Sequence, residues 1–120
     1  MDIIKKFDIK ELAQDFMQPP KIERRDKDSI LIFDYETDTG EYKWTGITFK
    51  DTIDEKYTKE KDVGEYMVKA YNSVVEVKNS DWISQTIAQD SNYKHYLVYF
   101  DGYGAYEFIC KDVIQGIVKN

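Results

Sequence analysis

The sequence contains a single cysteine, Cys110, and a single histidine, His95, among 120 residues. One cysteine cannot form an intramolecular disulfide, and one histidine excludes a histidine-rich metal site. A glycine-rich phosphate loop is also lacking, because the glycines of "DGYGAY" lie between strand-like runs instead of opening a helix. We therefore expect no catalytic residue, no metal and no cofactor, and we predict that the chain is not an enzyme.

Long apolar segments are missing too. The N-terminal "MDIIKKFDIKEL" has too short an apolar run and too many acids for a signal peptide, and no later segment approaches the length of a membrane span. These absences predict a cytoplasmic protein that does not enter a membrane. The composition is 42% hydrophobic and 33% charged with only two prolines, which is typical of a globular protein. We expect residues 1–120 to form a single domain around one core.

The net charge of −6 is distributed unevenly. Residues 1–28 hold seven acids and seven bases, residues 29–65 hold ten acids and five lysines, and residues 66–120 hold six acids and five lysines. The middle segment repels phosphate backbones and attracts basic surfaces, which argues against nucleic-acid binding and favours a basic partner. The alternative is that the acidic excess only keeps the protein soluble.

Three segments have apolar residues at helical spacing. In the first, Asp8 is a candidate N-cap and Pro19-Pro20 a stop. The second begins at Asp62 and places an apolar stripe between Val63 and Val74. The third starts from Ser80 as N-cap and runs past Ile87. These patterns predict three helices, and the polar segment 50–61 is expected to be a surface loop.

Two further segments predict β-hairpins. Residues 30–36 and 41–49 are joined by a turn in which Gly40 supplies a left-handed residue, and residues 95–110 surround a second glycine turn. With a two-residue loop in the second hairpin, one face would carry His95, Leu97, Tyr99, Tyr106, Phe108 and Cys110, and the other Tyr96, Val98, Phe100, Ala105, Glu107 and Ile109. Both faces are apolar, so this hairpin belongs in the middle of a covered sheet. We predict an α+β fold, with an antiparallel sheet of about four to six strands built from two hairpins and helices packed mainly on one face.

A carboxylate–lysine set imitates a magnesium nuclease. Glu41 and Lys43 flank Tyr42, and Asp28 or Asp34 would complete the set. An acidic residue two positions before a lysine is expected about three times by chance in this composition, and the chain has four such pairs. The Glu41–Lys43 pair is therefore not evidence for a nuclease. A magnesium-dependent nuclease-like enzyme is therefore the least favoured alternative.

Two segments carry a family resemblance. "SDWI" at 80–83 and "HYLVYFDGYGAYEFIC" at 95–110 give a Trp-started helix followed by an aromatic hairpin with Gly and Glu. This combination resembles the small acidic immunity proteins of bacterial contact-dependent and polymorphic toxin systems. The resemblance implies an inhibitor that binds one cognate toxin domain, of the nuclease kind, and occludes its active site or a nearby surface. A phage-encoded inhibitor of a host defence nuclease is the alternative.

Aromatic rings beside carboxylates suit a surface that anchors by its rings and selects by charge. The chain has ten tyrosines, two tryptophans and six phenylalanines. We expect a cognate protein toxin with a basic surface as the partner, and a monomer or weak dimer in its absence. The predicted partner-binding residues are Asp34, Glu36, Asp38, Glu41, Tyr42 and Glu107.

Overall fold

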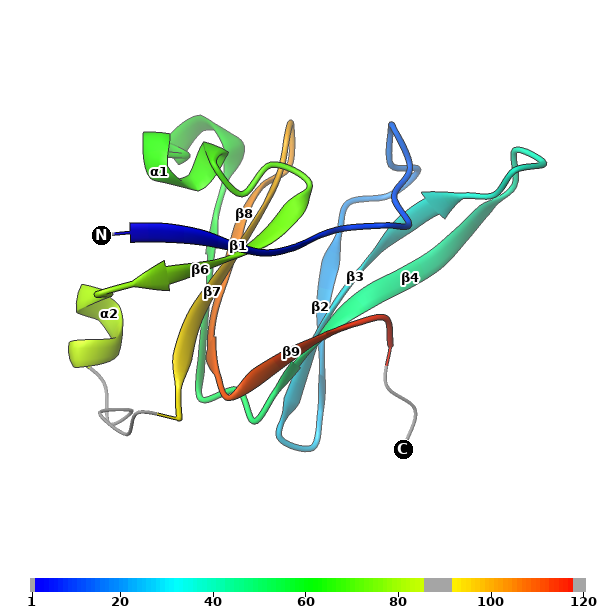
Figure 1. The fold of residues 1–120 in the computed structure, drawn as a ribbon. Coiled ribbons are helices and arrows are strands. Elements are labelled where there is room, and N and C mark those ends of the chain that lie inside the picture. Colours follow the sequence, from blue (N-terminus) through cyan, green and yellow to red (C-terminus); the bar gives the residue numbers. More distant parts are fainter. Residues whose placement is uncertain (1, 86–91, 118–120) are drawn as a thin grey trace.

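Two antiparallel sheets form the framework of the protein in a computed structural model, which describes residues 2–85 and 92–117 (Figure 1). Sheet A has the strand order β1-β6-β7-β8-β5, and sheet B has the order β2-β3-β4-β9. The strands of sheet A are β1 (Asp2–Asp8), β5 (Asp54–Thr58), β6 (Ser73–Lys78), β7 (Lys94–Phe100) and β8 (Gly104–Cys110). Those of sheet B are β2 (Lys21–Arg25), β3 (Asp28–Glu36), β4 (Tyr42–Lys50) and β9 (Asp112–Gln115).

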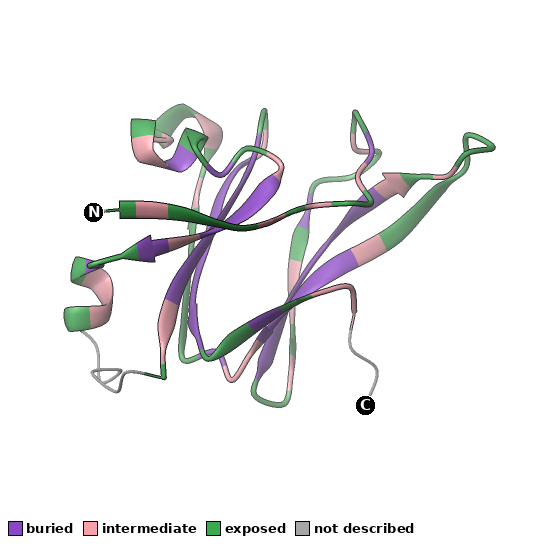
Figure 2. Ribbon diagram, in the orientation of Figure 1, coloured by how far each residue is buried: buried purple, intermediate pink, exposed green. Residues whose placement is uncertain are grey.

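The main core lies between the two sheets. Leu31, Phe33 and Phe49 of sheet B pack with Tyr96 and Phe108 of sheet A, and all five are buried. The rings of Phe49 and Phe108 stack at 3.8 Å between centroids with only 13° between their planes. Figure 2 shows the buried residues concentrated in the central strands, while the β3–β4 turn is exposed. Apolar alternation on the facing sides of the sheets therefore produces this core.

Short helices cover the outer face of sheet A. They are α1 (Glu65–Val68), α2 (Asp81–Ser84) and the 3-10 turn η1 (Glu60–Asp62). Met67 of α1 packs on Val75, Leu97 and Ala105, which form a second apolar cluster. Within residues 2–85 and 92–117, no helix has both the length and the apolar character needed to span a membrane.

The predicted α+β class is wrong, because the structure is mostly β and its described residues contain only two short α-helices. Residues 9–20, expected to be helical, form neither helix nor strand. The second predicted helix is cut to α1, after which Asn72 adopts φ 50° and the β-branched residues that follow become β6. β6 pairs with both β1 and β7, so tertiary pairing overrides the local helical spacing. In addition, β5 lies within the segment expected to be a loop.

The third predicted helix is confirmed at its start. Ser80 caps α2, and its Oγ accepts a hydrogen bond from the Ile83 N–H at 3.4 Å. The predicted continuation through Thr86 and Ile87 lies outside the described residues.

Both hairpins are present, but the predicted faces of the second are wrong. β7 and β8 are joined by three residues, Asp101, Gly102 and Tyr103, and Phe100 pairs with Gly104. A three-residue loop shifts the register by one relative to a two-residue loop, which moves every side chain of one strand to the opposite face. His95, Leu97 and Tyr99 therefore share the outer face of sheet A with Ala105, Glu107 and Ile109.

Gly104 lies where the β7–β8 hairpin packs closely against β5. It has φ +123°, and a Cβ at this position would lie 2.3 Å from the Thr58 carbonyl oxygen. Gly104→Ala is therefore expected to lower the free energy of unfolding by more than about 3 kcal/mol in urea denaturation. The control is Gly102→Ala, which has φ +85° and open space around it, and which should cost only about 1–2 kcal/mol. Equal losses in the two variants would contradict the packing of β5 on β8.

Candidate functional site

Most of the predicted contact residues meet at the end of the β3–β4 hairpin. Thr37 and Gly40 form its turn: the Gly40 N–H donates to the Thr37 carbonyl at 2.9 Å, and Gly40 has φ +83°. We call the exposed residues around this turn the acidic–aromatic hairpin; they are Glu36, Asp38, Glu41, Tyr42 and Trp44.

The two rings of the acidic–aromatic hairpin lie on the same face of β4. Glu36 pairs with Tyr42 across the strands, and Trp44 follows at the next position on that face. Tyr42 is 40% exposed and Trp44 43%, so neither ring belongs to the core. The Lys21 ammonium lies 5.3 Å above the Trp44 ring. Rings and carboxylates are thus accessible together, as a protein-binding surface requires.

Asp34 is not part of that surface. It is 3% exposed, and its Oδ2 accepts hydrogen bonds from the N–H groups of Met17 at 2.6 Å and Gln18 at 3.2 Å. Its carbonyl accepts another from the Ala13 N–H at 3.1 Å. The expectation that Asp34 contacts a partner therefore fails, because its carboxylate holds the irregular segment before β2 in place.

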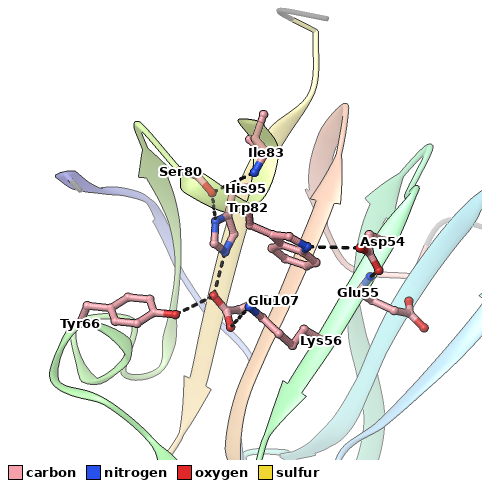
Figure 3. Close-up of polar contacts among 9 residues, drawn as sticks. All are labelled: Asp54, Glu55, Lys56, Tyr66, Ser80, Trp82, Ile83, His95 and Glu107. Carbon is pink, nitrogen blue, oxygen red and sulfur yellow. Dashed lines mark hydrogen bonds and ion pairs between the residues drawn. The ribbon is translucent and has the colours of Figure 1, made fainter. Parts of the chain in front are cut away.

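Glu107 is also unavailable for such a contact, since it is fully buried. Register is the reason: Glu107 pairs with Leu97 and points to the outer face of sheet A, beneath α1 and α2. There it is the centre of a buried polar network (Figure 3). The His95 Nε2 lies 2.8 Å from Glu107 Oε1, and the Tyr66 hydroxyl donates to the same oxygen at 3.1 Å.

The network continues from His95 to Ser80. The Ser80 Oγ lies 2.7 Å from His95 Nδ1, so the imidazole bridges a hydroxyl and a carboxylate. All three side chains come from different elements: Ser80 precedes α2, His95 is on β7 and Glu107 on β8. The pairing of β7 with β8 and the N-cap of α2 position them.

Lys56 of β5 and Trp82 of α2 lie next to the network. The Lys56 ammonium is 3.9 Å from Glu107 Oε2, too far for a hydrogen bond, and 4.6 Å from the centre of the Trp82 ring. The Trp82 indole N–H donates to Asp54 at 3.2 Å, and its ring meets that of His95 edge-on at 5.0 Å. A charged, aromatic cover thus shields the His95–Glu107 pair from water.

A hollow of about 580 Å³ opens beside Ser80. Its lining includes the apolar or aromatic residues Val77, Ile83 and Tyr93 and the charged residues Glu76, Lys78 and Lys94. Ser80, which contacts His95, therefore borders a space that a small molecule can enter.

The pKa of Tyr66 depends on its burial and on its contact with Glu107. Burial, the negative charge of Glu107 and their hydrogen bond raise this pKa from 10.0 to about 12. Because the folded state holds the phenol proton more tightly than the unfolded chain does, its contribution to stability is complete below pH 10 and is lost as the pH rises toward 12.

Tyr66→Phe is expected to weaken the alkaline loss of stability. Urea denaturation at pH 9 and pH 11 should show a smaller decrease in the free energy of unfolding for the variant than for the wild type. Some decrease remains, because burial also raises the pKa values of Tyr96, Tyr99 and Tyr106. Tyr42→Phe is the exposed control and should behave as the wild type. An unchanged decrease in Tyr66→Phe would mean that Tyr66 does not interact with a charged Glu107.

The nuclease-like carboxylate–lysine set is not assembled. Asp28 lies at the opposite end of β3 from the turn and binds Lys50 at 2.7 Å, while Asp34 is held by the backbone of residues 17 and 18. In the part of the chain that the structure describes, no three His, Cys, Asp or Glu side chains lie close enough together to hold a metal ion.

Ser80 and His95 are the functional candidates that sequence reasoning missed. Two features of the sequence could have indicated them: the even spacing between His95 and Glu107, which share a face when the loop has three residues, and the N-cap position of Ser80.

Comparisons with protein-family models, with curated proteins and with solved structures find no match to this chain.

Proposed function

We propose that the chain is an immunity protein, which binds a bacterial toxin domain with a basic surface and blocks its active site or a nearby surface. The observation that carries this proposal is the acidic–aromatic hairpin, which presents two exposed rings beside three exposed carboxylates. The resemblance of residues 80–83 and 95–110 to immunity proteins supports it independently.

The hairpin has the two features that rapid and tight binding requires. Glu36, Asp38 and Glu41 concentrate negative charge at one end of sheet B, which accelerates the encounter with a basic cleft. Tyr42 and Trp44 provide large rings with few rotatable bonds, whose burial on binding slows release. A nuclease toxin presents the basic surface that such a hairpin fits, because its own substrate is a polyanion.

Reversing the three hairpin charges tests this proposal. Glu36→Lys, Asp38→Lys and Glu41→Lys together are expected to slow association with the toxin domain encoded beside the inhibitor gene by about tenfold or more, and to flatten the salt dependence of the association rate. Stopped-flow fluorescence at low and at physiological salt measures both.

The matched control reverses three exposed acids at the far side of sheet A, Asp2, Glu65 and Asp81. It changes the net charge equally but leaves the hairpin intact, so a slower association confined to the hairpin variant locates the surface. An unchanged association rate in the hairpin variant, or equal slowing in both, would remove the acidic–aromatic hairpin as the binding surface.

A further inference from the structure

We propose that Ser80 is a nucleophile activated by His95, and that the hollow beside it accepts a carboxylic ester with a short apolar acyl group. Glu107 is the positioning residue that orients the imidazole. The inference goes beyond the proposed function and does not rest on it, because Ser80 lies between β6 of sheet A and α2, whereas the acidic–aromatic hairpin belongs to sheet B.

The hydrogen bonds fix the direction of proton transfer. An ionised carboxylate only accepts, so the imidazole nitrogen facing Glu107, Nε2 at 2.8 Å, carries a proton. The lone pair of Nδ1 in the neutral ring then faces the Ser80 hydroxyl at 2.7 Å and accepts its proton. A nucleophile, a base and a group that orients the base therefore stand in line as in a catalytic triad, with the two ring nitrogens exchanged relative to serine proteases: here Nδ1 faces the serine and Nε2 the carboxylate.

Glu107 is held firmly enough to orient the ring. Its carboxylate is fully buried, accepts a second hydrogen bond from Tyr66 and has the Lys56 ammonium 3.9 Å away. The edge-on contact with Trp82 restricts the His95 ring from the side. A serine that served only as a helix cap would need none of these contacts, since Ser80 already accepts from the Ile83 N–H.

Ser80 is also placed where nucleophilic serines are found in hydrolases. It follows β6 directly after Asn79, whose φ is +55°, and precedes α2, so it stands on a sharp strand-to-helix turn. Ser80 is 8% exposed and lines the 580 Å³ hollow. Val77, Ile83 and Tyr93 offer apolar contacts to a short acyl chain, although the lining also includes the charged residues Glu76, Lys78 and Lys94.

The reaction proceeds in two steps. The Ser80 Oγ attacks the carbonyl carbon while its proton moves to His95 Nδ1, and Nδ1 gives that proton to the alcohol oxygen as the bond from the acyl carbon to that oxygen breaks. Water then gives a proton to Nδ1 as it attacks the acyl carbon, and Nδ1 returns this proton to the Ser80 Oγ as the bond from the acyl carbon to Oγ breaks, which releases the carboxylic acid. Electrophiles with good leaving groups should react most readily, because the Ile83 N–H is engaged with the Ser80 Oγ and so is not free to bind the oxyanion.

Covalent labelling tests the proposal on the intact chain. Incubation with diisopropyl fluorophosphate should give one adduct per chain, with loss of fluoride, and tandem mass spectrometry should place it on Ser80. The same protein should release p-nitrophenolate from p-nitrophenyl acetate. Ser80→Ala should lose both reactions, while Thr39→Ala, which removes an exposed hydroxyl on the β3–β4 turn away from the hollow, should keep both.

The role of Glu107 has its own test. Glu107→Gln keeps the shape of the side chain but removes its charge, and it is expected to slow labelling of Ser80 at least about tenfold. Glu107→Asp, which keeps the charge, should be labelled faster than Glu107→Gln. Equal labelling rates in the wild type and in folded Glu107→Gln would remove Glu107 as the positioning residue.

Labelling of the wild-type chain decides the outcome even if Ser80→Ala fails to fold. An adduct on Ser80 that depends on His95, and is lost in His95→Gln, supports the proposal. An unmodified Ser80 in folded wild-type protein, or an adduct found only on tyrosine or lysine, overturns it.

Discussion

Phe108→Ala is expected to lower the free energy of unfolding by about 4 kcal/mol in urea denaturation at neutral pH. Phe108 is fully buried, and its ring stacks on Phe49 at 3.8 Å, where sheet A meets sheet B. Truncation removes this stack and leaves a cavity between two sheets that cannot close over it without moving their strands.

A matched aromatic control separates core packing from aromatic content. Tyr71→Ala removes a ring that is 55% exposed, and it should cost less than about 1 kcal/mol. A loss below about 1.5 kcal/mol for Phe108→Ala would show that the two sheets do not share the core described here.

Glu107→Leu is expected to cost about 3–5 kcal/mol, the typical penalty for breaking a buried polar pair by removing one partner. The substitution leaves the Tyr66 hydroxyl and the His95 imidazole without their acceptor inside a buried network. Replacing His95 with leucine as well removes the stranded partner, so the double variant should cost less than the sum of the two single variants.

The coupling between these two positions is the decisive quantity. A double-mutant cycle, with unfolding followed by circular dichroism, should give at least about 1 kcal/mol of interaction between His95 and Glu107. Strictly additive losses would show that the two side chains do not interact, and would contradict the network in Figure 3.

The hairpins could be predicted from the sequence because their signals are local. Gly40 and Gly102 mark the two turns with positive φ, and β-branched or aromatic residues flank them. The helices could not, because the same apolar residues fit either structure. Val74 ends the helical stripe in the sequence, but in the fold it belongs to β6 and pairs with Val98 of β7. Only the neighbouring strand decides between the two, and a single sequence does not show it.

The polar network was unpredictable for a different reason. Its assembly depends on one residue in the loop between β7 and β8, since a two-residue loop would place Glu107 and His95 on opposite faces. The sequence did indicate that Glu107 is exceptional on its strand, as a carboxylate among apolar residues. It did not show that a histidine, a tyrosine and a lysine from three other strands or helices surround it.

The acidic–aromatic hairpin was predicted more completely. Glu36, Asp38, Glu41 and Tyr42 all lie near a turn that the sequence marks, and all are exposed. Asp34 departs from the pattern because residues 17 and 18, far away along the chain, supply the donors that bury it.

Binding to the toxin is the central claim of the proposed function, and isothermal titration calorimetry measures it most directly. Titration of the purified chain into the toxin domain encoded beside its gene should give a 1:1 complex with a Kd in the nanomolar range or tighter at physiological salt. The absence of binding at protein concentrations of about 10 µM, with both partners folded, would contradict the claim.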